Sequence, residues 1–131
     1  MKVEFDGRAF TKEQQFAASL SPRWRKRVWA RVRVVSFDAE RYIKIRMPVD
    51  TGRARASWGH STAPASPADG IWHEDVDALA LTQGSRVEYI EYLNQGSSTQ
   101  APAGFIDAEK ARAERNLAAG IEDDLAQEWG R

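Results

Sequence analysis

The first half of the chain carries one long stripe of apolar residues that recur every three or four positions. This spacing places side chains on one face of an α-helix. Ser21 followed by Pro22 is a strong start signal, because serine caps free N–H groups and proline has none to lose. Met47–Pro48 ends the pattern. The spacing therefore predicts an amphipathic helix of about 25 residues, whose core face is Trp24, Val28, Val32, Val35, Ala39, Tyr42 and Ile43.

A shorter helix is expected just before this one. Thr11 followed by Gln14 fits a capping box, and apolar residues then recur at helical spacing as far as Leu20. Residues 10–47 are therefore expected to be helical, with a new start at Ser21.

Residues 53–83 are expected to form mainly strands and loop. Apolar and polar residues alternate over 53–61, which predicts a half-buried strand. Residues 62–70 (TAPASPADG) have no periodicity and predict a long exposed loop. One or two further strands are expected within 71–82, followed by a turn at 83–85.

The C-terminal third contains a signature segment, 86–104, and a final helix, 107–129. Residues 86–95 fit either a strand or a short helix, and Gly96 begins a loop. Gly120 inside the final helix costs about 1 kcal/mol relative to alanine, so this helix should depend on packing. Gly130 is a plausible C-cap. The expected core face of the final helix is Ala111, Leu117, Ala118, Ile121, Leu125 and Trp129.

The order of long helix, strands and C-terminal helix predicts an α+β fold. A chain of 131 residues is expected to form a single domain, residues 1–131. No run of about 18 apolar residues occurs, and the first residues lack the order of a signal peptide, so we expect a soluble protein made in the cytoplasm.

The formal net charge of zero conceals two opposite halves. Residues 21–60 hold eleven basic and three acidic groups, a net charge of +8. Residues 66–131 hold five basic and thirteen acidic groups, a net charge of −8. Such asymmetry can steer contacts between molecules, although each half could equally have a solvated charged face.

Few residues suit catalysis or metal binding. Cysteine is absent, which excludes disulfides, thiolate metal sites and cysteine nucleophiles. The two histidines, His60 and His73, have no metal-binding spacing, so no metal and no cofactor is expected. Asp50–Thr51–Gly52 matches the tripeptide of aspartic proteases, but it follows a basic helix and a proline rather than an apolar strand. A tight turn in which Asp50 accepts backbone N–H groups is the favoured interpretation.

Two strings resemble a known family. MPVDTGRARASW (47–58) is similar to the P-V-D-T-G-x-L-R-x-S pattern of the tailed-phage HK97 gp10-like family of neck and tail-completion proteins. YIEYLNQGSSTQAPAGFI (89–106) is similar to the family's second signature. Ala54 stands where the family usually has leucine, and Asn94 where many members have glutamate. The resemblance covers residues 10–125.

The resemblance implies a structural virion protein with no enzymatic activity. It implies a long helix, a small antiparallel β-sheet and a C-terminal helix. It also implies a place in the neck, or head-tail connector, or at the top of the tail of a bacteriophage or prophage. The chain would assemble there as a homo-oligomeric ring, a hexamer or dodecamer, after synthesis in the bacterial host cytoplasm. Other neck, head-completion and tail proteins would be its partners, and DNA would pass through the channel without sequence-specific recognition and without any membrane.

A ring closes when one face of each copy meets a different face of the next, which suits a chain with a basic and an acidic half. The loop from Gly96 to Gly104 is the first candidate for docking to another copy or to a partner protein, and the loop 62–70 is the second. The turn motif consists of Pro48, Asp50, Thr51 and Gly52. The candidate interface residues are Arg23, Arg27, Arg31 and Arg33 in the basic helix, with Gly96, Ser97, Ser98, Gln100, Pro102, Gly104 and Phe105.

The alternative is a small nucleic-acid-binding protein. The basic helix also carries Trp24 and Trp29, and basic groups interleaved with aromatic rings can bind phosphates and stack on bases. The same residues are compatible with an ordinary solvated basic face, in which Glu40 pairs with Lys44.

Overall fold

A computed structural model describes residues 1–7, 22–47, 55, 57–60, 69–96 and 103–129. It has the expected α+β class, with a long helix, a small antiparallel sheet and a C-terminal helix, but one strand of the sheet precedes the long helix in the chain. In chain order the elements are β1 (Lys2–Asp6), α2 (Pro22–Arg46), β2 (Gly70–Asp75), β3 (Ala80–Ser85), α4 (Glu88–Asn94) and α5 (Phe105–Trp129).

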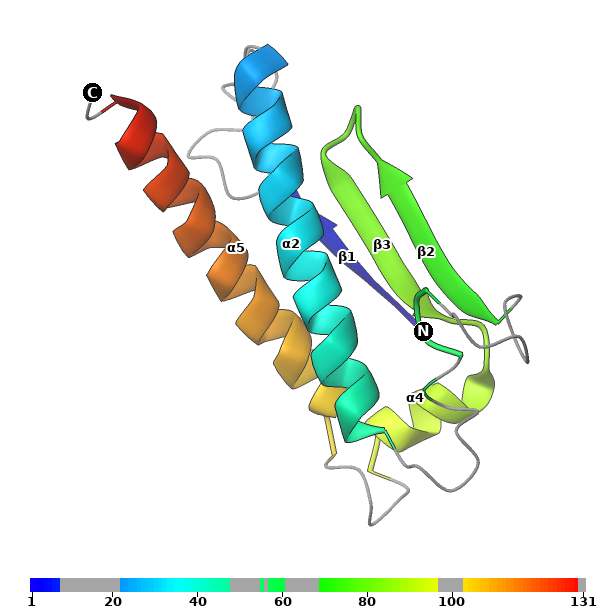
Figure 1. The fold of residues 1–131 in the computed structure, drawn as a ribbon. Helices are drawn as coiled ribbons and strands as arrows, with labels where there is room; N and C mark the ends of the chain where they lie inside the picture. Colours follow the sequence, from blue (N-terminus) through cyan, green and yellow to red (C-terminus); the bar gives the residue numbers. More distant parts are fainter. Residues whose placement is uncertain (8–21, 48–54, 56, 61–68, 97–102, 130–131) are drawn as a thin grey trace.

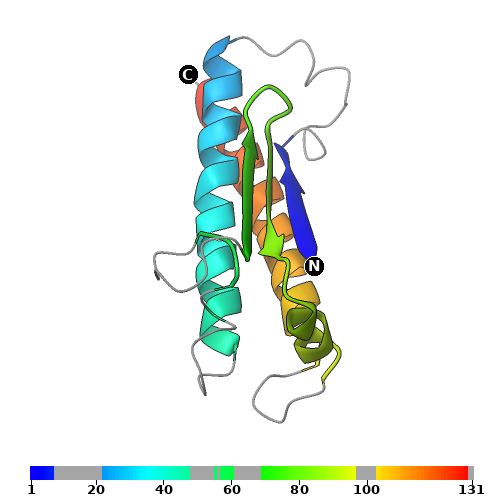
Figure 2. The same ribbon diagram turned by 90° about the vertical axis from the view of Figure 1, so that its right-hand side faces the viewer.

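The three strands form one antiparallel sheet in the order β1-β3-β2. Gln83 in the central strand pairs with Val3 on one side and Trp72 on the other. Helix α2 packs on β1 and β3, and α5 runs antiparallel along α2 (Figure 1). Helices α2 and α5 form one layer and the sheet forms the other (Figure 1), and the view turned by 90° looks through the sheet toward α5 (Figure 2).

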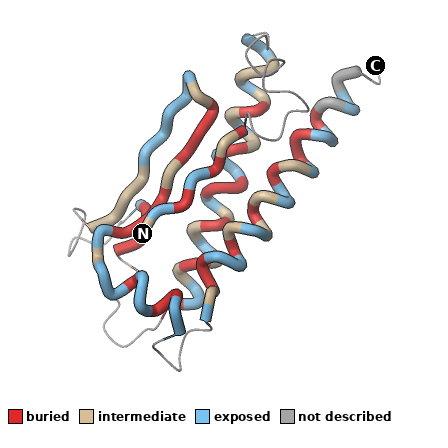
Figure 3. The backbone as a smooth tube through the Cα atoms, turned by 180° about the vertical axis from the view of Figure 1, so that it is seen from behind, coloured by how far each residue is buried: buried red, intermediate tan, exposed pale blue. Residues whose placement is uncertain are grey.

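The core lies between these layers, and helix α2 supplies its largest continuous stripe. Val28, Val32, Val35, Ala39 and Ile43 are buried, as the spacing predicts. The alternation of buried and exposed positions along α2 and the strands is visible in Figure 3. The stripe meets Phe5, Leu81, Trp58, Leu117 and Ile121 in a single cluster of buried residues.

Strand β1 was not among the expected elements. Its sequence, KVEFD, alternates strictly, with Val3 and Phe5 buried and Lys2 and Glu4 exposed. This alternation is the signal of a half-buried strand, and it was available in the sequence. The pairing of β1 with β3 was not, because 73 or more residues separate the paired positions.

The expected strand over 53–61 is wrong for the part that is described. Arg55 is helical, and residues 57–60 form a turn. The backbone of Gly59 has a φ of +61°, which interrupts extended structure. A side chain there would also collide with the carboxylate of Glu40. Trp58 is nevertheless fully buried, because the turn inserts its ring into the core.

The expected turn at 83–85 is also wrong, since β3 continues through Ser85. Gln83 and Gly84 pair with β1. The turn in this part of the chain lies instead at 76–79, where it joins β2 to β3. A glutamine and a glycine resemble turn residues in sequence. Here the glutamine is buried and hydrogen-bonded, and the glycine leaves room for the backbone of Met1.

The segment 88–94, which fitted either a strand or a helix, is the helix α4. Helix α5 begins at Phe105, two residues before the expected start. Leu117 and Ile121 are buried as expected, but Ala111 is exposed, and Ala113 and Ile106 fill the core instead. The side chains of Leu125 and Trp129, and Gly130, lie outside the described residues, as do the expected helix over 11–20 and the loops at 62–68 and 97–102.

Candidate functional site

The surface of helix α2 is the candidate site, and its arginines are largely paired within the chain. On the flank facing α5, Arg31 donates to both carboxylate oxygens of Asp124, at 3.1 and 2.9 Å. Arg27 reaches the same carboxylate at 3.4 Å. Asp124 is buried, so two guanidinium groups compensate one buried charge. The hydrogen bond to Asp124 raises the pKa of Arg31.

Gly120 leaves room for the Arg31 side chain in this contact. A Cβ atom at this position would lie 2.6 Å from Cδ of Arg31, which is closer than real contacts allow. The glycine therefore forms a gap in the surface of α5 through which Arg31 reaches Asp124, one helical turn further on. The residue that weakens α5 in isolation thus allows it to pair with α2.

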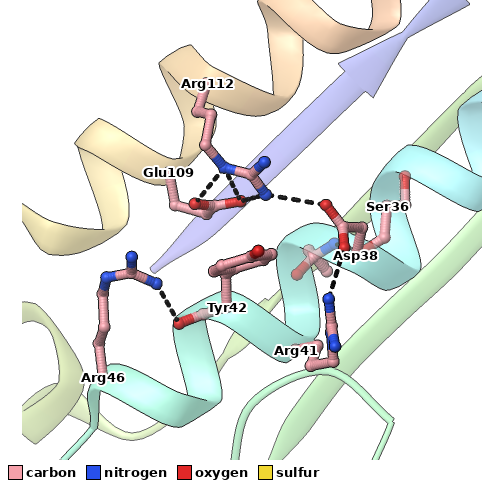
Figure 4. Close-up of polar contacts among 8 residues, drawn as sticks. Ser36, Asp38, Arg41, Tyr42, Arg46, Glu109 and Arg112 are labelled. Carbon is pink, nitrogen blue, oxygen red and sulfur yellow. Dashed lines mark hydrogen bonds and ion pairs between the residues drawn. The ribbon is translucent and has the colours of Figure 1, made fainter.

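A second charged cluster ties the helices together nearer the C-terminal end of α2 (Figure 4). Arg112 on α5 donates to Asp38 at 2.8 Å and to the buried carboxylate of Glu109 at 2.5 Å. Its guanidinium carbon lies 4.1 Å from the ring centroid of Tyr42, a cation–π contact. Arg41 also donates to Asp38, at 3.2 Å. These contacts fix the register of α2 against α5.

Asp38 stays ionised in this cluster. Burial is the largest single influence and on its own would raise the pKa of Asp38. The hydrogen bonds from Arg112 and Arg41 together outweigh burial and hold the pKa of Asp38 below its ordinary value. The hydrogen bonds to Glu109 and Asp38 raise the pKa of Arg112.

The opposite flank of α2 contacts the β2–β3 hairpin. Arg33 forms an ion pair of 2.5 Å with Glu74, and Arg25 donates to the backbone carbonyl of Asp77. Among the predicted interface residues, Arg27, Arg31 and Arg33 thus meet carboxylates of their own chain, while Arg23 is exposed on the first turn. These ion pairs join the basic and the acidic half inside one molecule, whereas contacts between copies were expected.

The described part of the second signature string joins α4 to α5. Oδ1 of Asn94 accepts the backbone N–H of Ile106 at 2.9 Å, and Nδ2 donates to Asp107 at 2.9 Å. The side chain thus caps the N-terminus of α5 from a distance, in the place of a local capping residue. Gly104, just before α5, has a φ of +72°.

The predicted interface residues of this string are only partly described. Phe105 is a core residue and offers no surface. The remaining predicted positions that lie outside the described residues are Ser97, Ser98, Gln100 and Pro102.

The described part of the first string lies against the C-terminal end of α2, beside the start of α5 (Figure 1). Arg55 donates to the carbonyl oxygens of Met47 and Ile45, at 3.2 and 3.1 Å, and so satisfies the last turn of α2. The motif residues Pro48, Asp50, Thr51 and Gly52, and Ala54, lie outside the described residues. Both strings therefore contribute to the chain reversals at one end of the molecule, where α2 ends and α5 begins (Figure 1).

Three rings stack between α2 and β2. The His60 ring is parallel to that of Phe37, with centroids 5.4 Å apart, and its centroid is 3.9 Å from that of Trp72. The backbone of His60 is held on both sides, because its N–H donates to Glu40 at 2.7 Å and its carbonyl accepts from Lys44 at 2.6 Å. His60 is therefore a packing residue of this turn.

Helix α2 also carries a second apolar stripe, which the sequence analysis missed. Ala30, Val34, Phe37 and Ile45 follow one another at helical spacing on the side away from the core, and all four are exposed. We call this set the outer stripe. The signal was the same three-to-four spacing as in the core stripe, but basic residues between its members conceal it.

The described residues contain no group of three or more histidine, aspartate, glutamate or cysteine side chains able to hold a metal ion. No described helix is long and apolar enough to cross a membrane. No protein-family model, curated protein or solved structure matches the sequence.

Proposed function

We propose that this chain is a structural virion protein of a tailed bacteriophage or prophage, without enzymatic activity. It forms part of the neck or completes the top of the tail, as an oligomeric ring around the DNA channel. The observation that carries the proposal is the pair of strings at 47–58 and 89–106, in the order and separation typical of the HK97 gp10-like family. The α+β order of elements supports it.

The contacts made by the strings give them a physical role. Arg55 closes the last turn of α2, and Asn94 caps the first turn of α5. Residues of this kind fix how two long helices turn back on each other. A pattern that encodes such chain reversals is characteristic of a fold, and so favours a shared architecture over a chance match of composition.

The nucleic-acid-binding alternative finds less support in the contacts. Arg27, Arg31 and Arg33 pair with carboxylates, which weakens their attraction for phosphate groups. Trp24 and Trp29 are half-buried and pack against the core, so their rings are not fully available for stacking on bases.

The experiment that tests the proposal is the analysis of particles. Phage particles are purified from a host that carries the gene, and the chain is quantified by mass spectrometry against the major capsid protein. We expect a fixed number of copies per particle. Deleting the gene should leave filled heads and separate tails, and supplying the gene on a plasmid should restore joined particles. Absence of the chain from particles, or normal particles after deletion, would refute the proposal.

A further inference from the structure

We infer that the outer stripe of α2 is the docking site for helix α4 of a second copy of this chain. The inference deepens the proposed ring and rests on it, because it names the two faces that would join neighbouring copies. Within one molecule Phe37 of the outer stripe stacks on His60, whereas Val34 and Ile45 remain more than half exposed.

The outer stripe is apolar, exposed and surrounded by positive charge. Val34 is 61% exposed and Ile45 is 58% exposed. Arg41 occupies the helical position between them, with a side chain that is 65% exposed. Near Ile45, Lys44 and Arg46 donate only to backbone carbonyls, and neither pairs with a carboxylate in the part of the chain that the structure describes.

Helix α4 presents the complementary surface. Tyr89 is 51% exposed and Tyr92 is 57% exposed, and their separation of three residues places them side by side on the helix. Glu88 and Glu91 flank them, both exposed, and within the described ranges neither forms an ion pair. Exposed tyrosines at the centre of a small patch are typical anchors of protein interfaces.

Helix α4 is firmly held from behind. Ile90 and Leu93 are fully buried, and the backbone and side chain of Asn94 are hydrogen-bonded to the start of α5. The outer face therefore does not have to be ordered on binding, which lowers the entropic cost of association. Seven residues of helix span about 10 Å, and the stretch from Val34 to Ile45 spans about 16 Å, so the α4 surface fits on the stripe.

The charges determine which faces can meet. Two α2 stripes in contact would bring basic groups together, and two α4 faces would bring glutamates together, and like charges oppose association. Contact between α4 and α2 brings Glu88 and Glu91 close to Lys44, Arg46 and the exposed Arg41, which also pairs with Asp38. Both faces remain exposed in the single molecule, so the contact joins different copies. Such head-to-tail contact produces rings or filaments rather than closed dimers.

Cross-linking tests this contact directly, because the natural chain has no cysteine. Ile45→Cys and Tyr92→Cys are made in separate full-length proteins, one with a mass tag, and the two are mixed under mild oxidation. Because the cross-link can form only when the two cysteines meet, we expect about tenfold more tagged heterodimer from this mixture than from the controls. The controls are each protein alone and Ile45→Cys mixed with Val76→Cys, whose exposed position lies on the β2–β3 turn.

A charge exchange provides the second measurement. Arg41→Glu should lower the cross-link yield about tenfold, and Glu88→Arg with Glu91→Arg in the Tyr92→Cys partner should restore it. Equal yield with Val76→Cys, or efficient cross-linking of Ile45→Cys to itself, overturns the inference. If the chain is present in particles and the cross-link fails, the inference is wrong and the proposed function stands. If the chain is absent from particles, the proposed function fails whatever the cross-link yields.

Discussion

The inner and outer faces of helix α2 are made of similar residues and have opposite surroundings. Ile43 is fully buried, and Ile45, two positions on, is 58% exposed. Val32 and Val34 show the same contrast. Apolar spacing therefore identifies a helix and its possible contact faces, but it does not say which face packs in the chain's own core and which is left for a partner.

The matched pair Ile43→Ala and Ile45→Ala tests this contrast most strongly. Ile43→Ala leaves a cavity in a packed core and should lower the free energy of unfolding by about 2–5 kcal/mol. Ile45→Ala should change it by less than about 0.5 kcal/mol, because the side chain is exposed. Chemical denaturation of dilute protein measures both. Similar losses at the two positions would contradict the division into inner and outer faces.

A polar contact beneath the inner face should have the next largest effect. Gln83 accepts the indole N–H of Trp58 and donates to the backbone carbonyl of Ser36 on α2, both at 2.8 Å. Gln83→Ala leaves both buried groups without a partner and should cost about 2–4 kcal/mol. Thr82→Ala, on the opposite face of the same strand, is the control. A loss no greater than that of the control would show that water replaces the glutamine.

On the flank of α2 that faces α5, the effect of Gly120→Ala on stability is expected to change sign when Arg31 is removed. Gly120→Ala favours the helix by about 1 kcal/mol, but it displaces Arg31 from Asp124, so in the natural chain it should lower stability by about 1 kcal/mol. In an Arg31→Ala background the same change should raise stability by about 1 kcal/mol. Thermal unfolding of the four proteins measures this coupling. Additive effects would rule out the proposed role of the glycine.

The smallest effect concerns Asp38 and acid. The pKa of Asp38 is lower in the folded protein than in the unfolded chain. The contribution of the ionised Asp38 to the free energy of unfolding is therefore complete above about pH 4, and it is lost as the pH falls through the folded pKa. Asp38→Asn should therefore destabilise the protein near neutral pH, by less than about 1 kcal/mol because the group is partly exposed. The difference from the natural chain should shrink toward about pH 3. If the difference in stability between Asp38→Asn and the natural chain does not change with pH, the destabilisation comes from the altered side-chain shape and not from the lost charge.

The sequence was sufficient for the parts of the fold that rest on local periodicity. The limits of α2 and its buried stripe follow from helical spacing and from the Ser21–Pro22 start. The C-terminal helix was located in the same way, two residues late at its start, and strands β2 and β3 fall largely within 71–82, where one or two strands were expected. Strand β1 could have been found from its alternation, so its omission was an error of interpretation.

The candidate site was less predictable. The sequence indicated opposite charges in the two halves but not that Arg31 and Asp124, 93 positions apart, would pair inside one molecule. The core position of Phe105 and the cap made by Asn94 depend on how α4 meets α5. The strand expected over 53–61 is wrong at 57–60 because a turn, and not alternation along a strand, inserts the ring of Trp58 into the core.

The sequence by itself determined the α+β class, the long amphipathic helix and the presence of two opposite charge clusters. These features depend on the order of apolar and charged residues over a few helical turns, because helix geometry places regularly spaced residues on the same face. The tertiary structure decided which charges meet in the chain, which of the two apolar stripes is core, and why a glycine sits inside α5. Those outcomes depend on contacts between residues far apart in the sequence, and periodicity carries no information about partners.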